Sequence, residues 1–347
     1  MGEEAAAQGV SVLLGPGLNI KRSPLCGRNF EYFSEDPYLA GKMAAAYVRG
    51  IQKNGISACP KHFAVNSQEL RRMASDSVLD ERTLRELYLT GFEIVVKEAK
   101  PKTIMTSYNL INGTYANENA HLLQDILRKD WGFDGAVVTD WGGSNDHALG
   151  VKNGSTLEMP CPGGDSIREL MKAVRDGKIS EADVDARLDE MLELVLSTHA
   201  AVEKAPRTFD AAAHHKLARR AAAESIVLLR NEGGILPLKP NEKLAVIGDF
   251  AETPRYQGAG SSAVNALQVD TLLDSIKADD SGITLVGYAS GFERQGAADA
   301  EKLEEAVALA KKADTVLLCL GLDELRESEG LDRSDMKLAE NPVSYTH

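Results

Sequence analysis

The sequence predicts an α/β protein that begins with part of a parallel (β/α)8 barrel of the TIM type and continues into a second α/β unit. Apolar runs of strand length alternate with amphipathic stretches of helix length along the chain. This repeated order implies parallel strands joined by right-handed crossovers. A length of 347 residues, with 43% hydrophobic and 26% charged residues, suits two domains or one large domain and a piece of another.

The first unit is predicted to span residues 1–199 as a partial barrel. Five strand-length runs occur in it, and a barrel of eight would need further strands upstream. These runs are VSVLLG (10–15), ISACPKHF (56–63), TIMTSY (103–108), GAVVTD (135–140) and TLEMP (156–160). Helices are predicted near 37–53, 80–97, 119–129, 165–175 and 181–198, the last of which begins with a capping box of Ser180 and Asp183.

A polar segment separates this unit from a second one. Residues 200–213 contain Pro206 and are predicted to form a linker. The second unit is predicted over residues 214–347 and alternates helices with apolar strands. Its elements are a helix (214–229), the strands KLAVIGDF (243–250) and ITLVGYA (283–289), a helix (297–312) and the strand TVLLCLGL (315–322). We expect this α/β unit to be incomplete as well.

Both ends of the chain are unusual for a complete protein. Glu3 to Gln8 is predicted to form the last turns of a helix that leads into the strand from Val10 to Leu14. At the other end, AENPVSYTH (339–347) follows a hydrophilic stretch without a closing element. We expect a truncated reading frame whose last few residues are foreign.

The charge balance and the cysteines limit the classes of partner. The chain has 39 Lys and Arg against 52 Asp and Glu, a formal net charge of −13, and such a surface repels the phosphate backbones of nucleic acids. No apolar run is long enough to cross a bilayer, and the first ten residues lack the pattern of a signal peptide. We expect a cytoplasmic protein with free thiols, because no metal-binding spacing links Cys26, Cys59, Cys161 and Cys319.

One short stretch, VVTDWGG (137–143), places the carboxylate of Asp140 between a buried strand and a tryptophan. In a parallel barrel, side chains at the carboxyl ends of the strands converge on one mouth, where active sites lie. The other predicted strand ends supply cations and aromatic rings. We therefore expect one pocket to contain Arg28, Lys61, His62, Tyr108, Asp140 and Trp141.

Cations around a single carboxylate are expected to lower the pKa of Asp140 and keep the group ionised. An ionised carboxylate beside an aromatic ring suits a sugar, whose hydroxyls need charged donors, and an oxocarbenium-like transition state, which needs an anion nearby. Two alternatives are open at this point. Asp140 could cap the next helix, and Lys61 could be the Schiff-base lysine of a barrel aldolase.

Several longer stretches are similar to one known family. GPGLNIKRSPLCGRNFEYFSEDP, KHFAVNSQE, MTSYNLINGTYANEN and VVTDWGG resemble family 3 glycoside hydrolases of the β-glucosidase type. The resemblance continues through FDAAAHHKLARRAAAESIVLLRNEGGILPL, the YQGAGSS loop and ESEGLDR, and it covers nearly the whole chain apart from its last several residues. Because the matches follow the family's order, the set is far more specific than any one motif.

The resemblance implies a TIM-like barrel followed by an α/β sandwich domain. It also implies a retaining, exo-acting β-glycosidase that removes terminal β-D-glucosyl residues by double displacement. Asp140 matches the catalytic nucleophile, and Glu329, on a loop of the second unit, matches the general acid/base. The substrate would be a small-molecule β-glucoside or oligosaccharide, without a cofactor or metal. Residues that match the sugar subsite are Arg28, Lys61, His62, Met105, Tyr108, Trp141 and, from the second unit, Ser261.

Two departures from family patterns refine this expectation. The N-acetylglucosaminidases of the family carry a KHFPGHG-like loop whose histidine is the acid/base, whereas this chain has KHFAVNSQE and the ESEG glutamate. That difference favours the β-glucosidase type. A DGPxG(L/V)R-like segment, whose aspartate binds sugar hydroxyls in the family, does not occur in these residues. We therefore expect little or no turnover from the chain as written.

Other interpretations stay open. A different family 3 specificity, such as a β-xylosidase, or a non-catalytic sugar-binding relic would also fit the sequence. Glu329 lies in a charged run of a kind that is typical of a solvated face, and Arg28 could simply pair with the acidic residues that follow it. The loop QGAGSS lacks the third glycine of a dinucleotide site. Adjacent His214 and His215 point about 100° apart on a helix, so packing is preferred over a metal site.

Overall fold

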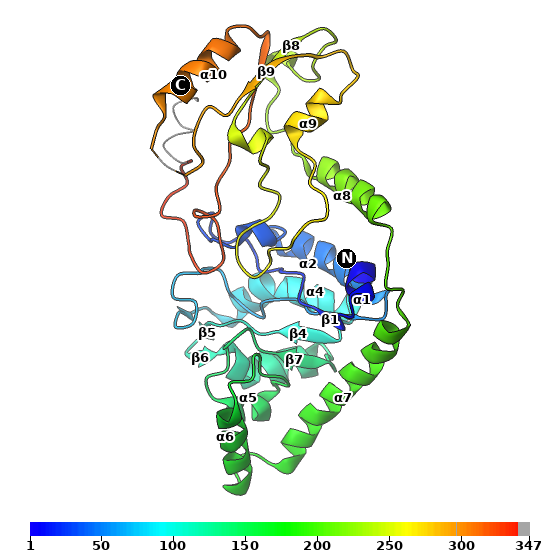
Figure 1. Cartoon of the computed structure of the whole chain (residues 1–347). Coiled ribbons are helices and arrows are strands. Elements are labelled where there is room, and N and C mark those ends of the chain that lie inside the picture. Colours follow the sequence, from blue (N-terminus) through cyan, green and yellow to red (C-terminus); the bar gives the residue numbers. More distant parts are fainter. Residues whose placement is uncertain (296, 339–347) are drawn as a thin grey trace. The chain divides into compact units, whose positions relative to one another are not determined.

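The computed structural model describes residues 1–295 and 297–338 and divides into two compact units (Figure 1). The first unit consists of Met1–Phe209 together with Gly330–Asp332, and the second consists of Asp210–Glu329 with the residues from Arg333 onward. The C-terminal stretch that we predicted to be foreign lies outside the described residues. Within the described ranges, no helix combines the length and apolar character needed to cross a membrane.

The first unit is built on parallel strands. β1 (Val12–Leu13) pairs with β2 (Ser57–Ala58), and β4 (Thr103–Met105) pairs with β7 (Ala136–Val138). Parallel bridges join these pairs to one another and to the fifth predicted strand. They link Gly17 with Lys61, Phe63 with Thr106, and Val138 with Leu157. The five predicted strands therefore lie side by side in the order of the sequence, as successive strands of a barrel do.

Two helices of the first unit, α2 (Pro37–Gln52) and α4 (Thr90–Ala99), pack side by side (Figure 1). Asp36 caps α2 by accepting the N–H of Tyr38 at 2.8 Å. The two helices approach closely because Gly41 has no side chain. A Cβ at that position would lie 3.1 Å from the Cα of Gly91.

The remaining helices of the first unit fall close to their predicted positions, except α5 (His147–Asn153), which was not predicted. α3 (Glu81–Thr83) and the π-helical segment η2 (Leu84–Leu89) lead directly into α4, and a second π-helical segment, η4, spans His121–Asp130. The capping box of Ser180 and Asp183 is confirmed at the start of α7. The other helices of this unit are α1 (Gly2–Ala7), α5 (His147–Asn153), α6 (Gly164–Arg175) and α7 (Glu181–Lys204).

The linker is shorter than predicted, and a small sheet was missed. α7 continues to Lys204 and α8 begins at Ala211, so much of the predicted linker at 200–213 is helical. The missed sheet consists of β3 (Asp76–Ser77), β5 (Leu110–Ile111) and β6 (Thr114–Tyr115). Its strands have two residues each, too few for a period-2 pattern to stand out in the sequence.

The second unit contains a three-stranded parallel sheet in which β8 (Lys243–Ile247) lies between β10 (Thr315–Leu318) and β9 (Thr284–Ala289). Its helices are α8 (Ala211–Ser225), α9 (Leu272–Lys277) and α10 (Ala300–Ala310). The prediction that the first helix reaches residue 229 was wrong. The chain turns extended at Ile226, with φ −71° and ψ 127°, where the β-branched pair of Ile226 and Val227 disfavours a helix.

Candidate active site

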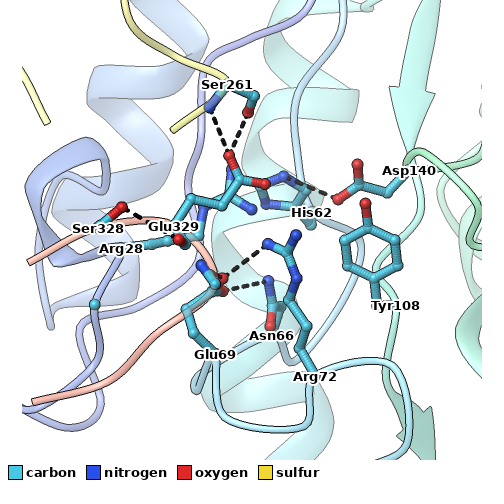
Figure 2. A network of polar contacts seen from close by, with 12 residues as sticks. Arg28, His62, Asn66, Glu69, Arg72, Tyr108, Asp140, Ser261, Ser328 and Glu329 are labelled. Atoms are coloured by element: carbon cyan, nitrogen blue, oxygen red, sulfur yellow. Dashed lines mark hydrogen bonds and ion pairs between the residues drawn. The ribbon is translucent and has the colours of Figure 1, made fainter. Parts of the chain in front are cut away.

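Three strand ends of the first unit place polar side chains together. Lys61 and His62 follow β2, Tyr108 follows β4, and Asp140 follows β7. Strands β2, β4 and β7 are neighbours, joined by pairing or by single bridges, so these residues leave the same edge of the array. Figure 2 shows His62, Tyr108 and Asp140 directed toward one another.

Asp140 is a buried carboxylate, only 7% exposed. Its Oδ1 accepts the N–H of Trp141 at 2.8 Å. Its Oδ2 has no hydrogen-bond partner among the described residues and lies 3.4 Å from Nε2 of His62. The alternative that Asp140 caps the next helix is wrong, because Asp146 caps α5 by accepting the N–H of Leu149.

The expected direction of the Asp140 pKa was also wrong. Burial raises the pKa of this carboxyl above its ordinary value of 3.8. The N–H of Trp141, the charges of Arg28 and Lys61 and the hydroxyl of Tyr108 oppose this shift without reversing it. The sequence shows the cations but not the depth of burial, and here desolvation has the larger effect.

His62 is held neutral beside Asp140. Burial, with the charges of Arg28, Lys61 and Arg72, lowers the pKa of His62 well below 6.5. The hydroxyl of Tyr32 lies 3.4 Å from Nδ1 of His62, and burial raises the pKa of Tyr32 well above 10, so this hydroxyl stays protonated. An ionised carboxylate can only accept, so ionised Asp140 favours the tautomer of His62 that carries its proton on Nε2, the nitrogen that faces it.

Asn19 fixes the backbone under His62 through two hydrogen bonds. Its Oδ1 accepts the N–H of His62 at 2.7 Å, and its Nδ2 donates to the carbonyl of the same residue at 2.9 Å. All four interacting groups are buried. The side chain of Asn19 therefore fixes the backbone at His62, near the carboxyl end of the second predicted strand.

The two cations of the predicted pocket share one acid. Arg28, 1% exposed, donates from Nε to Oε1 of Glu31 at 2.5 Å, and Nζ of Lys61 lies 4.0 Å from the other oxygen. The alternative that Arg28 pairs with a nearby acid is confirmed, but the same guanidinium also acts electrostatically on Asp140. Glu31 thus holds both cations in place, a role that the sequence analysis did not assign to it.

Tyr108 and Trp141 are linked, and Met105 is buried. The hydroxyl of Tyr108 donates to the carbonyl of Trp141 at 2.9 Å. The guanidinium of Arg72 lies 4.5 Å from the centre of the Tyr108 ring. Trp141 is 42% exposed and can offer a ring face to a ligand, whereas Met105 in β4 is almost fully buried. Arg72 was not predicted, and its only sequence signal is that it follows the KHFAVNSQE stretch.

In the second unit, Glu329 is held by the QGAGSS loop. The N–H and the hydroxyl of Ser261 both donate to Oε2 of Glu329, at 2.7 and 2.5 Å (Figure 2). The N–H of Glu329 donates to the carbonyl of Ala259 at 3.0 Å, next to a parallel bridge between Ala259 and Ser328. The resemblance had singled out both Ser261 and Glu329, and the structure brings these two together.

Two further residues of the second unit shape this loop, and neither was predicted. Gly260 has a φ of +121°, and a Cβ there would lie 2.4 Å from the Cβ of Glu329. Arg255 donates to the carbonyl of Leu322 at 3.0 Å and to both the side chain and the carbonyl of Glu327, at 2.8 and 2.9 Å. The charged run is therefore partly an ordered network rather than a solvated face.

Two histidines away from Asp140 have acidic partners. His147, at the start of α5, lies 3.3 Å from Glu158, and His215 lies 3.0 Å from Asp270. In residues 1–295 and 297–338, no group of three or more His, Cys, Asp or Glu side chains is arranged to hold a metal ion.

Comparison with known proteins identifies the family. Residues 1–194 match the model of the glycosyl hydrolase family 3 N terminal domain, and residues 226–344 match that of the family 3 C-terminal domain. The chain belongs to glycosyl hydrolase family 3. The predicted fold, a TIM-barrel-like domain followed by a second α/β domain, is thereby confirmed.

Individual family 3 proteins match along almost the whole chain. Thermostable beta-glucosidase B of Acetivibrio thermocellus is 46% identical over 345 residues, which cover 98% of this chain and 45% of the relative. Exo-alpha-(1->6)-L-arabinopyranosidase of Bifidobacterium longum is 45% identical over 354 residues, which cover 99% of this chain and 46% of the relative.

Solved family 3 structures agree with this match. The crystal structure of the Bifidobacterium adolescentis GH3 beta-glucosidase aligns with a TM-score of 0.93 at 44% identity and covers 99% of this chain and 50% of that chain. Beta-glucosidase 3B of Thermotoga neapolitana in complex with glucose aligns with a TM-score of 0.87 at 34% identity, over 99% of this chain and 52% of that chain. The chain thus spans about half the length of these family 3 relatives.

Proposed function

We propose that this family 3 chain carries the catalytic residues of a retaining, exo-acting β-glucosidase that hydrolyses small-molecule β-glucosides or oligosaccharides. The observation that supports this best is Oδ2 of Asp140, a buried carboxylate oxygen with no hydrogen-bond partner among the described residues. A buried polar atom without a partner needs an explanation, and attack on a sugar carbon supplies one.

In the first step, Oδ2 of Asp140 attacks the anomeric carbon and the bond from that carbon to the leaving oxygen breaks. Glu329 gives its proton to the leaving oxygen and becomes a carboxylate. Burial makes Asp140 a stronger base than an exposed aspartate, because it raises the pKa of the carboxyl. The charges of Arg28 and Lys61 oppose this rise and favour the ionised form that attacks.

In the second step, ionised Glu329 takes a proton from water, whose oxygen attacks the anomeric carbon and releases Asp140. Two inversions give a product with the configuration of the substrate. This mechanism requires the carboxyl groups of Asp140 and Glu329 to come within about 5–5.5 Å of one another. The paired contacts from Ser261 hold one oxygen of Glu329 and so orient its carboxyl group.

The sugar would be bound by the groups around Asp140. Lys61 and Arg28 are charged donors for hydroxyls, and the neutral His62 offers its Nε2 proton on the same side as Oδ2 of Asp140. The half-exposed Trp141 supplies a ring face on which a pyranose can stack. Nζ of Lys61 lies 4.0 Å from a carboxylate oxygen of Glu31, an ion-pair contact that favours this role over that of a Schiff-base lysine.

A second sugar specificity is supported by one comparison. The Bifidobacterium arabinopyranosidase is almost as similar to this chain as the Acetivibrio β-glucosidase, at 45% and 46% identity. An α-L-arabinopyranoside has the equatorial anomeric bond of a β-glucoside but lacks the hydroxymethyl group and has the opposite configuration at C4. The same nucleophile and acid could serve both sugars, with the contacts at C4 and C6 deciding between them.

One experiment tests the reaction type and the sugar together. The chain is incubated with 4-nitrophenyl β-D-glucoside, β-D-xyloside and α-L-arabinopyranoside, and released nitrophenol is followed over hours. Methanol is added as an acceptor, and proton NMR of the methyl glycoside then reports the anomer, because a glycoside does not mutarotate. We expect slow turnover, with the glucoside reacting fastest and giving the methyl β-glucoside. An α-anomer as the first product would exclude the retaining mechanism. If the unmodified chain and D140N both bind the sugar and neither shows any turnover, the chain is a sugar-binding relic.

We also propose that the chain works in a reducing compartment, the cytoplasm. All four cysteines are free, and Cys26 and Cys59 are buried. Burial raises the pKa of each of these two thiols to about 12, which keeps them protonated and slow to oxidise. Fractionation of the source cells with a specific antibody tests this, and recovery from the extracellular fraction would contradict it.

A further inference from the structure

The segment that directly follows Glu329 is built into the first unit. Gly330–Asp332 belongs to that unit, although the residues on either side of the segment belong to the second. Asp332 is three residues beyond the glutamate that we propose as acid/base. The contacts of this segment therefore bear on where Glu329 can be held.

The carboxylate of Asp332 binds three backbone N–H groups of the first unit. Oδ1 accepts from Gly27 and Glu69, each at 3.0 Å, and Oδ2 accepts from Glu69 at 3.0 Å and from Leu70 at 2.8 Å. These donors lie in two separate loops, one next to Arg28 and one at the end of the KHFAVNSQE stretch, where Glu69 is its last residue and Leu70 follows. An ionised carboxylate that accepts several N–H groups forms charge-assisted bonds, which are about twice as strong as neutral ones.

Glu69 binds the same segment in return. Its Oε2 accepts the N–H of Gly330 at 2.8 Å, while its own N–H is held by Asp332. The side chain of Glu69 is fully buried and also accepts from Arg72 at 2.8 Å, and Arg72 in turn lies over the ring of Tyr108 (Figure 2). We call these reciprocal contacts of Glu69 with Gly330 and Asp332 the Glu69–Asp332 clasp.

The clasp limits the movement of Glu329 through the chain itself. Three peptide units separate the Cα atoms of residues 329 and 332, and their combined reach is at most about 11 Å. The Cα of Glu329 therefore stays within that distance of the Cα of Asp332. The length of the tether thus follows from covalent geometry alone.

We propose that Asp332 is a positioning residue, whose carboxylate anchors the chain after Glu329 to the two loops that supply Gly27 and Glu69–Leu70, and so keeps the acid/base in reach of the sugar. This inference rests on the proposed function. The inference assigns a role to the aspartate near the end of the ESEGLDR motif, to which the proposed catalytic mechanism gives none.

The first test measures the clasp directly. Amide hydrogen exchange is followed by mass spectrometry in unmodified chain, D332A, D332N and the control D335N, since Asp335 is a nearby acid that accepts the local N–H of Lys337. We expect the amides of Gly27, Glu69 and Leu70 to exchange at least tenfold faster in D332A, with a smaller change in D332N and none in D335N. Unchanged exchange in D332A would overturn the proposal.

The second test asks whether the clasp acts through Glu329. A 2,4-dinitrophenyl β-glucoside leaves without acid assistance, whereas a phenyl β-glucoside needs a proton from the general acid. We expect D332A to lose at least tenfold in rate on the phenyl glucoside and less than threefold on the dinitrophenyl glucoside, with partial recovery in D332N. Equal losses on the two substrates would reduce Asp332 to a structural role and overturn the proposal.

The two proposals fail in different ways. If unmodified chain hydrolyses the dinitrophenyl glucoside and D332A keeps the normal dependence on the leaving group, only the positioning role is wrong. If a 2,4-dinitrophenyl 2-deoxy-2-fluoro-β-D-glucoside leaves no adduct on Asp140 of the unmodified chain, the proposed function is wrong for this chain, and the positioning role is wrong with it. The exchange data would then describe a purely structural clasp.

Discussion

Ser261 donates twice to the same oxygen of Glu329, from its N–H at 2.7 Å and from its hydroxyl at 2.5 Å. Two donors on one carboxylate oxygen fix the rotation of the group about its last bond. An acid that must deliver a proton along one line depends on such orientation. Under the proposed mechanism, the contact gives a serine in a glycine-rich loop a direct influence on proton transfer by Glu329.

Replacing Ser261 with alanine removes one of these two donors and leaves the backbone donor in place. We expect S261A to lose about tenfold in rate on phenyl β-glucoside, the size of one hydrogen bond to a charged group, and to change little on dinitrophenyl β-glucoside. The neighbouring S262A is the matched control. An S261A enzyme that equals S262A on both substrates would rule out the orienting role.

Gly260 is expected to tolerate no side chain. A Cβ there would lie 2.4 Å from the Cβ of Glu329 and 2.8 Å from its Oε2, and the φ of +121° disfavours any other residue. We expect G260A to lose at least a hundredfold on phenyl β-glucoside, because Glu329 must move. G233A, at another positive φ but with open space around it, controls for backbone strain alone. Comparable activity in G260A and G233A would show that the close approach is unimportant.

The burial of the Asp140 carboxyl group should destabilise the folded chain at neutral pH, and replacement with asparagine should restore that stability. The pKa of Asp140 is raised in the folded chain, so the unfolded state releases this proton more easily, and folding loses stability as pH rises from 3.8 through the folded pKa. We therefore expect D140N to have a higher Tm than unmodified chain at pH 7, with the difference shrinking toward pH 4. The exposed D134N is the control for a change of net charge. A lower Tm for D140N at pH 7 would contradict the assigned direction.

His62 should make the fold sensitive to mild acid. Its pKa is lowered well below 6.5 in the folded chain, so below pH 6.5 the unfolded state binds a proton that the folded state does not. The stability that the neutral ring provides is present above pH 6.5 and is lost as pH falls below it. We expect the Tm to drop between pH 7 and pH 5 by more than it drops in H62Q. Equal drops would show that another group dominates this range.

Much of the first unit could be predicted because its strands are parallel and buried. Such strands stand out in the sequence as apolar runs, and their carboxyl ends lie at one edge of the barrel. The sequence therefore predicted that His62, Tyr108 and Asp140 lie close together. The pairing of Ser261 with Glu329 was different. Those residues are 68 positions apart, in a loop and a charged run, and only the family resemblance linked them.

Other features depended on three-dimensional packing that a single sequence does not encode. The pKa of Asp140 rises because burial outweighs the nearby cations, and burial depth cannot be counted from neighbours in the chain. Asp332 looked like a member of a solvated charge run, yet its carboxylate accepts several backbone N–H groups. Arg255 was not considered at all, although it donates to the carbonyls of Leu322 and Glu327. A side chain at Gly260 would collide with the Cβ of Glu329. The preference of glycine for turns does not reveal this close approach.

The most direct test of the central claim is to trap the sugar on the nucleophile. A 2,4-dinitrophenyl 2-deoxy-2-fluoro-β-D-glucoside reacts without acid assistance, while its fluorine slows hydrolysis of the glycosyl-enzyme, so even a slow enzyme accumulates the adduct. Peptide mass spectrometry then locates it. We predict an adduct on Asp140 in unmodified chain and in E329Q, and none in D140N. An adduct on any other carboxylate, or undiminished turnover by D140N, would contradict the account.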